Sequence, residues 1–368
     1  MAKLGDIATY INGYAFKPQD WSDEGVPIIR IQDLTGNSYQ ANRYNGEYAS
    51  KYEVNDGDVL ISWSASLGVY IWHGEKAVLN QHIFKVVFDK ERISKDFFVH
   101  QVGLILENAA SDAHGATMKH LTKPVFDALP FYLPPYEKQC EIAEVLDKVT
   151  RLIFLRKQQL AKLDELVKAR FVEMFETRKY PIEKLGRVCE KITDGTHKTP
   201  TYLDSGIKFI SAKNIIDGKV DLTDTKYISK NEYQEIQKRC QVEIQDILLT
   251  KSGTLGIPAI IRTDCALGLF ESLAVIKYDR SKLLPYFLYE QLRCNRVQRQ
   301  FKAGTKGVAV KHLHLGVISD IDIIVPPISF QLEFSDFAEQ VDKQKQTVQQ
   351  SLEKLEVMKK ALMQEYFG

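Results

Sequence analysis

The sequence lacks the marks of a disulfide-bonded, zinc-binding or membrane-spanning protein. Its few cysteines lie far apart and form no Cys-x-x-Cys pair, so neither a zinc site nor a disulfide framework is expected. No apolar run reaches the about 18 residues that a membrane span needs. Residues 1–6 lack the apolar stretch of a secretory signal. We therefore expect the chain to work in a reducing cytoplasm.

The sequence also lacks a recognisable catalytic set. The segment Gly-Thr-Lys-Gly at 304–307 is the nearest approach to a phosphate-binding loop, and it lacks the Gly-Lys-Ser/Thr ending. The segment Leu-Pro-Pro-Tyr at 133–136 resembles the Pro-Pro-aromatic motif of amino-group DNA methyltransferases. However, Leu133 stands where that motif has Asp or Asn, and an aliphatic side chain accepts no hydrogen bond. We expect no catalytic residue, metal or cofactor in this chain, and therefore a binding role.

Charge of one sign is not in excess either. The chain has 49 basic and 48 acidic residues, a net charge of +1, whereas many nucleic-acid-binding proteins are strongly basic. The distribution is uneven: residues 1–135 hold 12 basic and 16 acidic residues, a net charge of −4. Residues 181–327 hold 22 basic and 17 acidic residues, a net charge of +5. The two halves of the chain are electrostatically unequal.

What the sequence does contain is an internal repeat. The tripeptide Lys-Leu-Gly occurs at 3–5 and again at 184–186. Asp-Val-Leu-Ile-Ser at 58–62 matches Asp-Ile-Leu-Leu-Thr at 246–250, and Leu-Pro-Pro at 133–135 matches Val-Pro-Pro at 325–327. The matches keep their order along the chain. They predict two copies of one module of about 185 residues, too long a period for a solenoid and so a domain duplication.

Each module is predicted to have an α/β part followed by a long helix. β-branched and aromatic runs punctuated by Gly, Asn and Asp predict short strands, and helices are expected near 95–109 and 284–301. The fold class is mixed α+β: two duplicated α/β domains separated by a pair of long antiparallel coiled-coil helices. The predicted boundaries are 1–135 for the first domain, 136–180 for its helix, 181–327 for the second domain and 328–368 for its helix.

The two long helices begin after paired prolines and continue for about 40 residues without Pro or Gly, a length of roughly 60 Å. Apolar residues recur every seven positions in each, which is typical of a coiled coil. The predicted core residues are Ile153, Leu160, Val167 and Met174 in the first helix and Val341, Val348, Leu355 and Leu362 in the second. The alternative is that each helix packs on its own domain alone.

Three repeated segments carry polar side chains of the kinds that contact bases and phosphates. In the segment at 30–33 and its match at 211–214, the flanking apolar frame is kept while the polar residues differ, as expected for two modules that read different sequences. The candidate DNA-binding residues are Arg30, Gln32 and Asp33 with Ser211, Lys213 and Asn214; Ser62, Trp63 and Ser64 with Thr250, Lys251 and Ser252; and Lys119 with Lys311 and His312. The alternative for each is an ordinary solvated turn.

The second module adds further candidates. Arg293, Arg296 and Arg299 are three apart and would share one face of the helix predicted near 284–301. Lys306 follows them, and His197 and Lys198 lie in a separate glycine-containing polar loop. This pattern predicts a phosphate-contacting patch, with a solvated helix face as the alternative. His312 and His314 lack Cys or carboxylate neighbours at ligand spacing, so no metal site is expected there.

The duplication, the proline-opened helices and their first turns together resemble the specificity subunits of type I restriction–modification systems. The resemblance is carried by Leu-Pro-Pro-Tyr-Glu-Lys-Gln at 133–139, by Ile-Ala-Glu-Val-Leu-Asp at 142–147, and by Val-Pro-Pro at 325–327 with Gln331. It implies that each α/β part is a target recognition domain for one half of a split DNA site. It further implies that the paired helices fix the spacing between the halves.

The resemblance also implies partners. Two modification subunits would bring S-adenosylmethionine and adenine methylation, and restriction subunits would bring ATP- and magnesium-dependent translocation and cleavage of double-stranded DNA, in the cytoplasm of a bacterium or archaeon. This chain would supply only the sequence recognition and the scaffold. Two alternatives stay open: the specificity subunit of a related restriction or phage-defence system, and a coiled-coil adaptor that binds proteins and no DNA.

Overall fold

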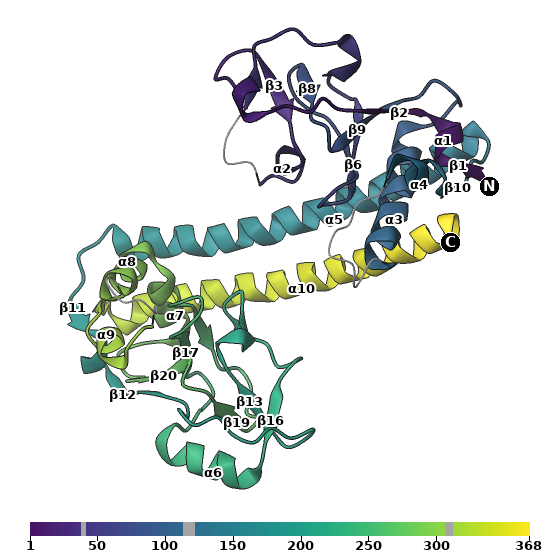
Figure 1. Ribbon diagram of the computed structural model, residues 1–368. Coiled ribbons are helices and arrows are strands. Elements are labelled where there is room, and N and C mark those ends of the chain that lie inside the picture. The colour runs from purple at the N-terminus through teal and green to yellow at the C-terminus, as the bar shows by residue number, and fades with distance from the viewer. Residues whose placement is uncertain (38–41, 113–121, 306–311) are drawn as a thin grey trace. The chain divides into compact units, whose positions relative to one another are not determined.

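The computed structural model describes residues 1–37, 42–112, 122–305 and 312–368 (Figure 1). Contacts divide the chain into two units. The first unit comprises Met1–Lys157 with Gln350–Gly368, and the second comprises Gln158–Gln349. Each unit therefore contains an α/β module and one part of each long helix.

The first unit is built on two four-stranded sheets. Its strands are β1 (Ala2–Lys3), β2 (Thr9–Asn12), β3 (Val26–Ile29), β4 (Arg43–Tyr44), β5 (Glu53–Val54), β6 (Val59–Ser62), β7 (Gly68–Ile71), β8 (Ala77–Leu79), β9 (Ile83–Val87) and β10 (Pro130–Phe131). One sheet has the antiparallel order β2-β9-β6-β7, the other has the order β4-β3-β8-β5 with β3 and β8 parallel, and β1 pairs with β10. All four residues of β6 are buried, because Ile61 faces one core and Leu60 faces another.

Helices complete the core of the first unit. They are α1 (Leu4–Ile7), α2 (Ile31–Leu34), α3 (Lys95–Asp112), α4 (Lys123–Asp127) and parts of the long helices α5 (Tyr136–Phe171) and α10 (Ile328–Phe367). Leu146 of α5 and Phe367 of α10 pack into the core that also holds Phe97. The rings of Phe97 and Phe367 lie 5.4 Å apart. The start of α5 and the end of α10 are thus joined through one apolar core.

The second unit repeats this topology. Its strands are β11 (Ile182–Lys184), β12 (Cys189–Asp194), β13 (Ile207–Ile210), β14 (Ile215–Ile216), β15 (Lys219–Val220), β16 (Lys226–Ile228), β17 (Ile247–Thr250), β18 (Pro258–Ile260), β19 (Leu267–Leu269), β20 (Leu273–Tyr278) and β21 (Asp322–Ile324). The order β12-β20-β17-β18 reproduces β2-β9-β6-β7, and β16-β13-β19 reproduces β4-β3-β8. The antiparallel pair β11–β21 corresponds to β1–β10. The duplication predicted from the sequence is confirmed.

Helices α6 (Lys230–Arg239), α7 (Pro285–Arg293), α8 (Asn295–Gly304) and α9 (Leu315–Ser319) belong to the second unit. Its main core joins Phe171 of α5 and Phe334 of α10 with Phe287 of α7. Asp164 of α5 is bonded to Lys345 of α10. The guanidinium of Arg170 lies 2.8 Å from the carboxylate of Glu333. From Asp164 to Arg170 along α5, the bonded residue of α10 changes from Lys345 to Glu333, so the two helices run antiparallel.

The long helices are those expected from the proline-opened segments, and the mixed α/β class is confirmed. Of the predicted heptad residues, the buried ones are Val167, Met174, Val341 and Val348, and the partly buried ones are Ile153, Leu160, Leu355 and Leu362. Met174 lies beyond α5, in the π-helical turn Val172–Glu176.

The single helix predicted near 284–301 is two helices in the structure. The segment 284–301 breaks at Cys294, whose φ of −64° and ψ of 151° are extended, so α7 ends at Arg293 and α8 begins at Asn295. The side-chain amide of Gln298 donates to the carbonyl of Leu292, which the break would otherwise leave without a donor. The prediction that Arg293, Arg296 and Arg299 share one helical face is therefore wrong, because the first lies on α7 and the others on α8.

Of the helices within the described ranges, none combines the length and the apolar character that crossing a bilayer requires.

Candidate nucleic-acid interface

In the first unit, the end of β2 meets the end of β6 and the turn before β9. In the second unit, the end of β12 meets the end of β17 and the turn before β20. We call these places the first junction (Asn12, Trp63 and His82) and the second junction (Asp194, Lys251 and Ser272). Their backbones are bonded in the same way. Gly13 N–H donates to the carbonyl of Ile83 (3.1 Å), and Gly195 N–H donates to that of Leu273 (3.4 Å).

The backbone approaches so closely at both junctions that only glycine fits. A Cβ atom on Gly13 would lie 2.1 Å from the carbonyl oxygen of Asn80. A Cβ atom on Gly195 would lie 2.1 Å from that of Leu269. The two junctions therefore share one backbone frame, which the repeat builds twice.

The hydroxyl-rich loops after β6 and β17 also share one construction. Ser62 Oγ donates to the carbonyl of Ser66, and Thr250 Oγ1 donates to the carbonyl of Thr254. Ser62, Thr250 and Ser64 are all buried. These three predicted DNA-contacting side chains face the interior, where the hydroxyls of Ser62 and Thr250 hold the loop.

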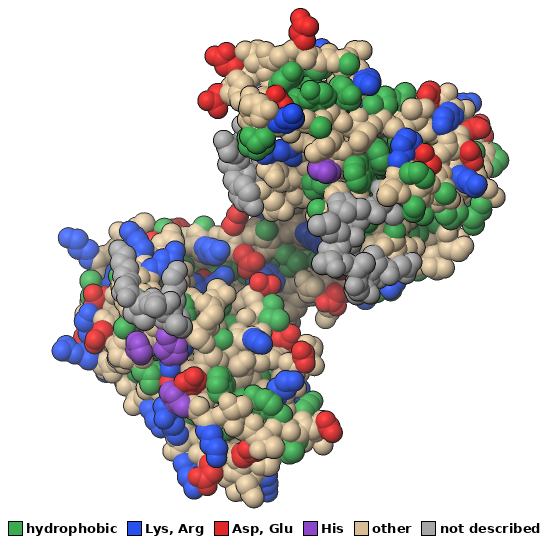
Figure 2. All heavy atoms as spheres, viewed as in Figure 1, with side chains coloured by type: hydrophobic (Ala, Val, Ile, Leu, Met, Phe, Trp, Pro, Cys, Tyr) green, Lys and Arg blue, Asp and Glu red, His purple; other side chains and the backbone are tan. Residues whose placement is uncertain are grey.

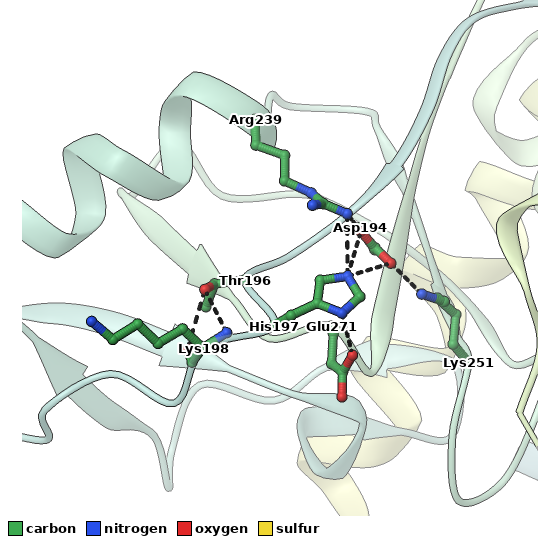
Figure 3. Close-up of polar contacts among 7 residues, drawn as sticks. All are labelled: Asp194, Thr196, His197, Lys198, Arg239, Lys251 and Glu271. Carbon is green, nitrogen blue, oxygen red and sulfur yellow. Dashed lines mark hydrogen bonds and ion pairs between the residues drawn. The ribbon is translucent and has the colours of Figure 1, made fainter.

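The second junction contains a network of charged side chains (Figure 3). The carboxylate of Asp194 accepts hydrogen bonds from Lys251 and from Arg239, the last residue of α6. His197 lies beside them, with Nε2 3.3 Å from Asp194 and Nδ1 2.6 Å from Glu271. Burial alone would raise the pKa of Asp194, but the bonds from Lys251 and Arg239 outweigh burial and hold that pKa below its ordinary value.

His312 adjoins this network. It forms a β-bridge with Ser252, and the N–H of Leu313 donates to the carbonyl of Lys251 (2.8 Å). The ring of His312 lies 5.3 Å from that of His314. Burial, then the charges of Lys251 and His314, lower the pKa of His312. Figure 2 shows histidine side chains gathered on one face of the second unit, with lysine and arginine side chains beside them.

The first junction has an amide and aromatic rings at the same places. The indole Nε1 of Trp63 donates to Oδ1 of Asn12 (3.2 Å). The Trp63 ring stacks on Phe84 with centroids 5.7 Å apart, and it meets His82 edge-on at 5.5 Å. The first junction therefore presents an aromatic ring and an amide where the second presents ions.

The predicted segments at Arg30 and Ser211 form matching turns. Asp33 accepts the N–H of Arg30 (2.8 Å), and Asn214 accepts the N–H of Ser211 (3.0 Å). The side chain of Gln32 lies against the Arg30 guanidinium, which itself lies over the Trp21 ring at 5.9 Å. The second of these segments reaches the junction, because Ala212 N–H, next to the exposed Lys213, donates to Ser272 Oγ (2.9 Å).

The remaining candidates lie at the edge of this network, apart from it, or outside the described residues. Arg293 pairs with Glu290 at 2.7 Å and lies over the Tyr289 ring at 5.0 Å. Arg299 is exposed on α8, and Lys198 is exposed beside His197. Three predicted residues lie outside the described residues: Lys119, Lys306 and Lys311.

The sequence interpretation did not select Asn12, His82, Asp194 and Ser272 at the junctions, or Arg239 and Glu271 in the charged network of the second unit. A signal for two of them was available, because the repeat aligns Asn-Gly at 12–13 with Asp-Gly at 194–195. The contribution of Arg239 had no such signal, since it depends on the docking of α6 against the sheet.

Two copies of one α/β module, each followed by a long helix and each with an ordered polar junction at the same place, define a duplicated two-module protein. Residues 1–165 and 179–357 match the type I restriction modification DNA specificity domain. The chain therefore belongs to the family of type I restriction–modification specificity subunits.

Relatives across the family agree with this assignment. The type I restriction enzyme EcoBI specificity subunit of Escherichia coli is 28% identical over 373 residues, covering 92% of this chain and 78% of the relative. The MjaVIII specificity subunit of Methanocaldococcus jannaschii is 21% identical over 390 residues, covering 99% of this chain and 90% of the relative.

Solved structures share the fold. The S subunit of a type I restriction–modification system from M. genitalium superimposes with a TM-score of 0.61 at 13% identity, over 100% of this chain and 95% of that one. A second chain comes from a study of complex assembly and conformational transition in the type I system. It has a TM-score of 0.56 at 15% identity, over 100% of this chain and 96% of that one.

Proposed function

We propose that this chain is the sequence-reading subunit of a type I restriction–modification complex. In this proposal the module of each unit reads one half of an asymmetric, split site in double-stranded DNA, and the paired helices fix the number of unread base pairs between the halves. The chain itself performs no chemistry.

The observation that carries the proposal is that two junctions with one backbone frame hold different polar side chains. A duplicated reader for a symmetric site would gain nothing from this difference. Base edges are distinguished by the donors and acceptors opposite them, so unlike side chains in like frames suit unlike half-sites. The family to which the chain belongs supports a role in DNA specificity.

The long helices support the scaffolding part of the proposal. On α5, Leu152 and Leu155 lie three residues apart on one face and are 43% and 45% exposed. Large apolar side chains grouped on a surface mark sites of protein association. We assign this surface to a modification subunit, which would bring S-adenosylmethionine and the adenine-methylating site. Restriction subunits would bring ATP, magnesium and cleavage to the same assembly.

The proposal is tested by selecting bound duplexes from a random DNA pool with the purified complex of this chain and its modification subunit. We expect enrichment of two short blocks separated by an unread gap of fixed length. Affinity should fall steeply as salt rises, because phosphate contacts release counterions. A complex that forms but enriches no sequence and shows no salt-dependent DNA binding would instead support the protein-binding adaptor.

A further inference from the structure

A comparison of the two units distinguishes residues that both copies keep, which stabilise the fold, from residues that differ between the copies, which serve a function specific to each copy. Asp58 and Asp246 precede the equivalent strands β6 and β17, and each pairs with a lysine from the neighbouring strand. The distances are 2.9 Å to Lys85 and 2.7 Å to Lys277. The same ion pair is kept in both copies, so it belongs to the common frame.

The junction pair behaves differently. The same two places hold Asn12 with Trp63 in the first unit and Asp194 with Lys251 in the second, and in both units the second residue donates to the first. The link is kept while its chemistry changes from neutral and aromatic to charged. Because the same backbone arrangement holds a neutral pair in one unit and a charged pair in the other, the fold does not determine which pair is present.

In the second unit this pair holds a more exposed side chain in place. Asp194 and Lys251 are each only 2% exposed, whereas the side chain of Arg239 is 52% exposed. A buried lysine beside a buried carboxylate keeps that carboxylate ionised, and the carboxylate fixes the guanidinium through one of its nitrogens. Arg239 ends α6, and the corresponding stretch of the first unit, residues 45–58, contains no α-helix among its described residues.

We propose that Arg239 reads a base edge in the half-site bound by the second unit, and that Asp194 and Lys251 are positioning residues for its guanidinium. This inference rests on the proposed DNA-reading function. The most suitable target is the acceptor pair O6 and N7 of guanine, which a planar, oriented guanidinium meets with two donors. A phosphate contact needs charge rather than a fixed orientation, whereas the bond to Asp194 holds the guanidinium of Arg239 in one orientation.

The first unit makes the corresponding contact by other means. Asn12 is exposed and Trp63 is partly exposed, so an amide and an aromatic ring stand at this place in the frame. The Trp63→Phe variant removes the indole donor and keeps a ring. It should change the methylated motif in the half-site that Arg239→Gln leaves unchanged.

The test is methylation mapping in cells that lack other methyltransferases and express each variant with the modification subunit. With Arg239→Gln, one position of one half-site should lose discrimination by about 10- to 100-fold, while the other half-site and the spacer stay unchanged. Lys251→Met should relax the same position. The matched control is Lys277→Met, which removes the lysine of the ion pair with Asp246 in the same sheet and should leave the motif intact.

Several outcomes would overturn the inference. An unchanged motif with Arg239→Gln would do so, as would equal slowing of methylation at all sites, which indicates a phosphate contact. Relaxation by Lys277→Met at the same position would show a general loosening of the sheet. If Lys251→Met does not fold, Arg239→Gln decides alone, since its side chain lies at the surface. Failure of the proposed function itself is recognised separately, because the unmodified chain would then direct no split motif.

Discussion

Lengthening the paired helices should lengthen the unread spacer of the DNA site. Lys157–Glu356 (2.9 Å) and Asp164–Lys345 are bonds between α5 and α10, one in each unit. An insertion of seven residues after Gln158, with a second seven after Gln349, falls between these bonds in both helices. A heptad keeps the phase of the apolar seam, so the packing on either side should survive.

The expected change follows from helix geometry. Seven residues add about 10.5 Å at 1.5 Å per residue. That length corresponds to about three base pairs at 3.4 Å each. Methylation mapping should therefore show the same two half-sites, separated by a spacer about three base pairs longer.

The control inserts the heptad after Gln158 alone. This variant lengthens α5 but not α10, so the two helices no longer match in length, and methylation should be lost. A double insertion that folds, binds the modification subunit and methylates at the original spacing would refute the role of the helices as a ruler.

Further predictions concern the modules and their cores. Replacing residues 1–135 with the matching domain of a relative should change one half-site only, as read by methylation mapping; a change in both would contradict independent modules. Phe334→Ala should cost about 3–5 kcal/mol of unfolding free energy in denaturant titration, because the ring is fully buried between Phe171 and other aromatic rings. Gly195→Ala should lower the melting temperature sharply, since its Cβ would overlap a carbonyl oxygen; a stable variant would refute the close approach. Because the folded-state pKa of Asp194 is lowered, its contribution is present above the unfolded pKa of about 3.9 and is lost as pH falls through the folded value. Below about pH 4, the melting temperature should thus fall more steeply with decreasing pH for the unsubstituted chain than for Asp194→Asn.

The architecture was predictable because the sequence contains two copies of the module, which can be compared with each other. Matches such as 58–62 with 246–250 fall on the buried strands β6 and β17, whose apolar runs are fixed by burial on both faces. The long helices were marked by paired prolines and by the absence of Pro and Gly. The break at Cys294 had no such mark, because neither Pro nor Gly stands there. The interruption is supported by the side chain of Gln298, which donates to the carbonyl of Leu292 and to that of the distant Gly256.

The site was predictable in location more than in role. Lys251 was expected among the DNA contacts, and the structure places it at the junction, but buried against Asp194. Nothing near Lys251 in the sequence indicates that partner, since 57 residues separate the two. Likewise, Asp33 and Asn214 were proposed as DNA-binding residues, whereas their oxygens accept backbone N–H groups of their own turns. Short polar residues serve both purposes, and only the three-dimensional contacts distinguish them.

The most direct test of the central claim is a methylation map of cells that lack other methyltransferases, expressing the modification subunit with and without this chain. The account predicts a methylated, split and asymmetric motif that appears only when both proteins are present. Methylation of the same motif by the modification subunit alone would contradict the account. So would the absence of any motif from a complex that assembles and retains its methyl donor.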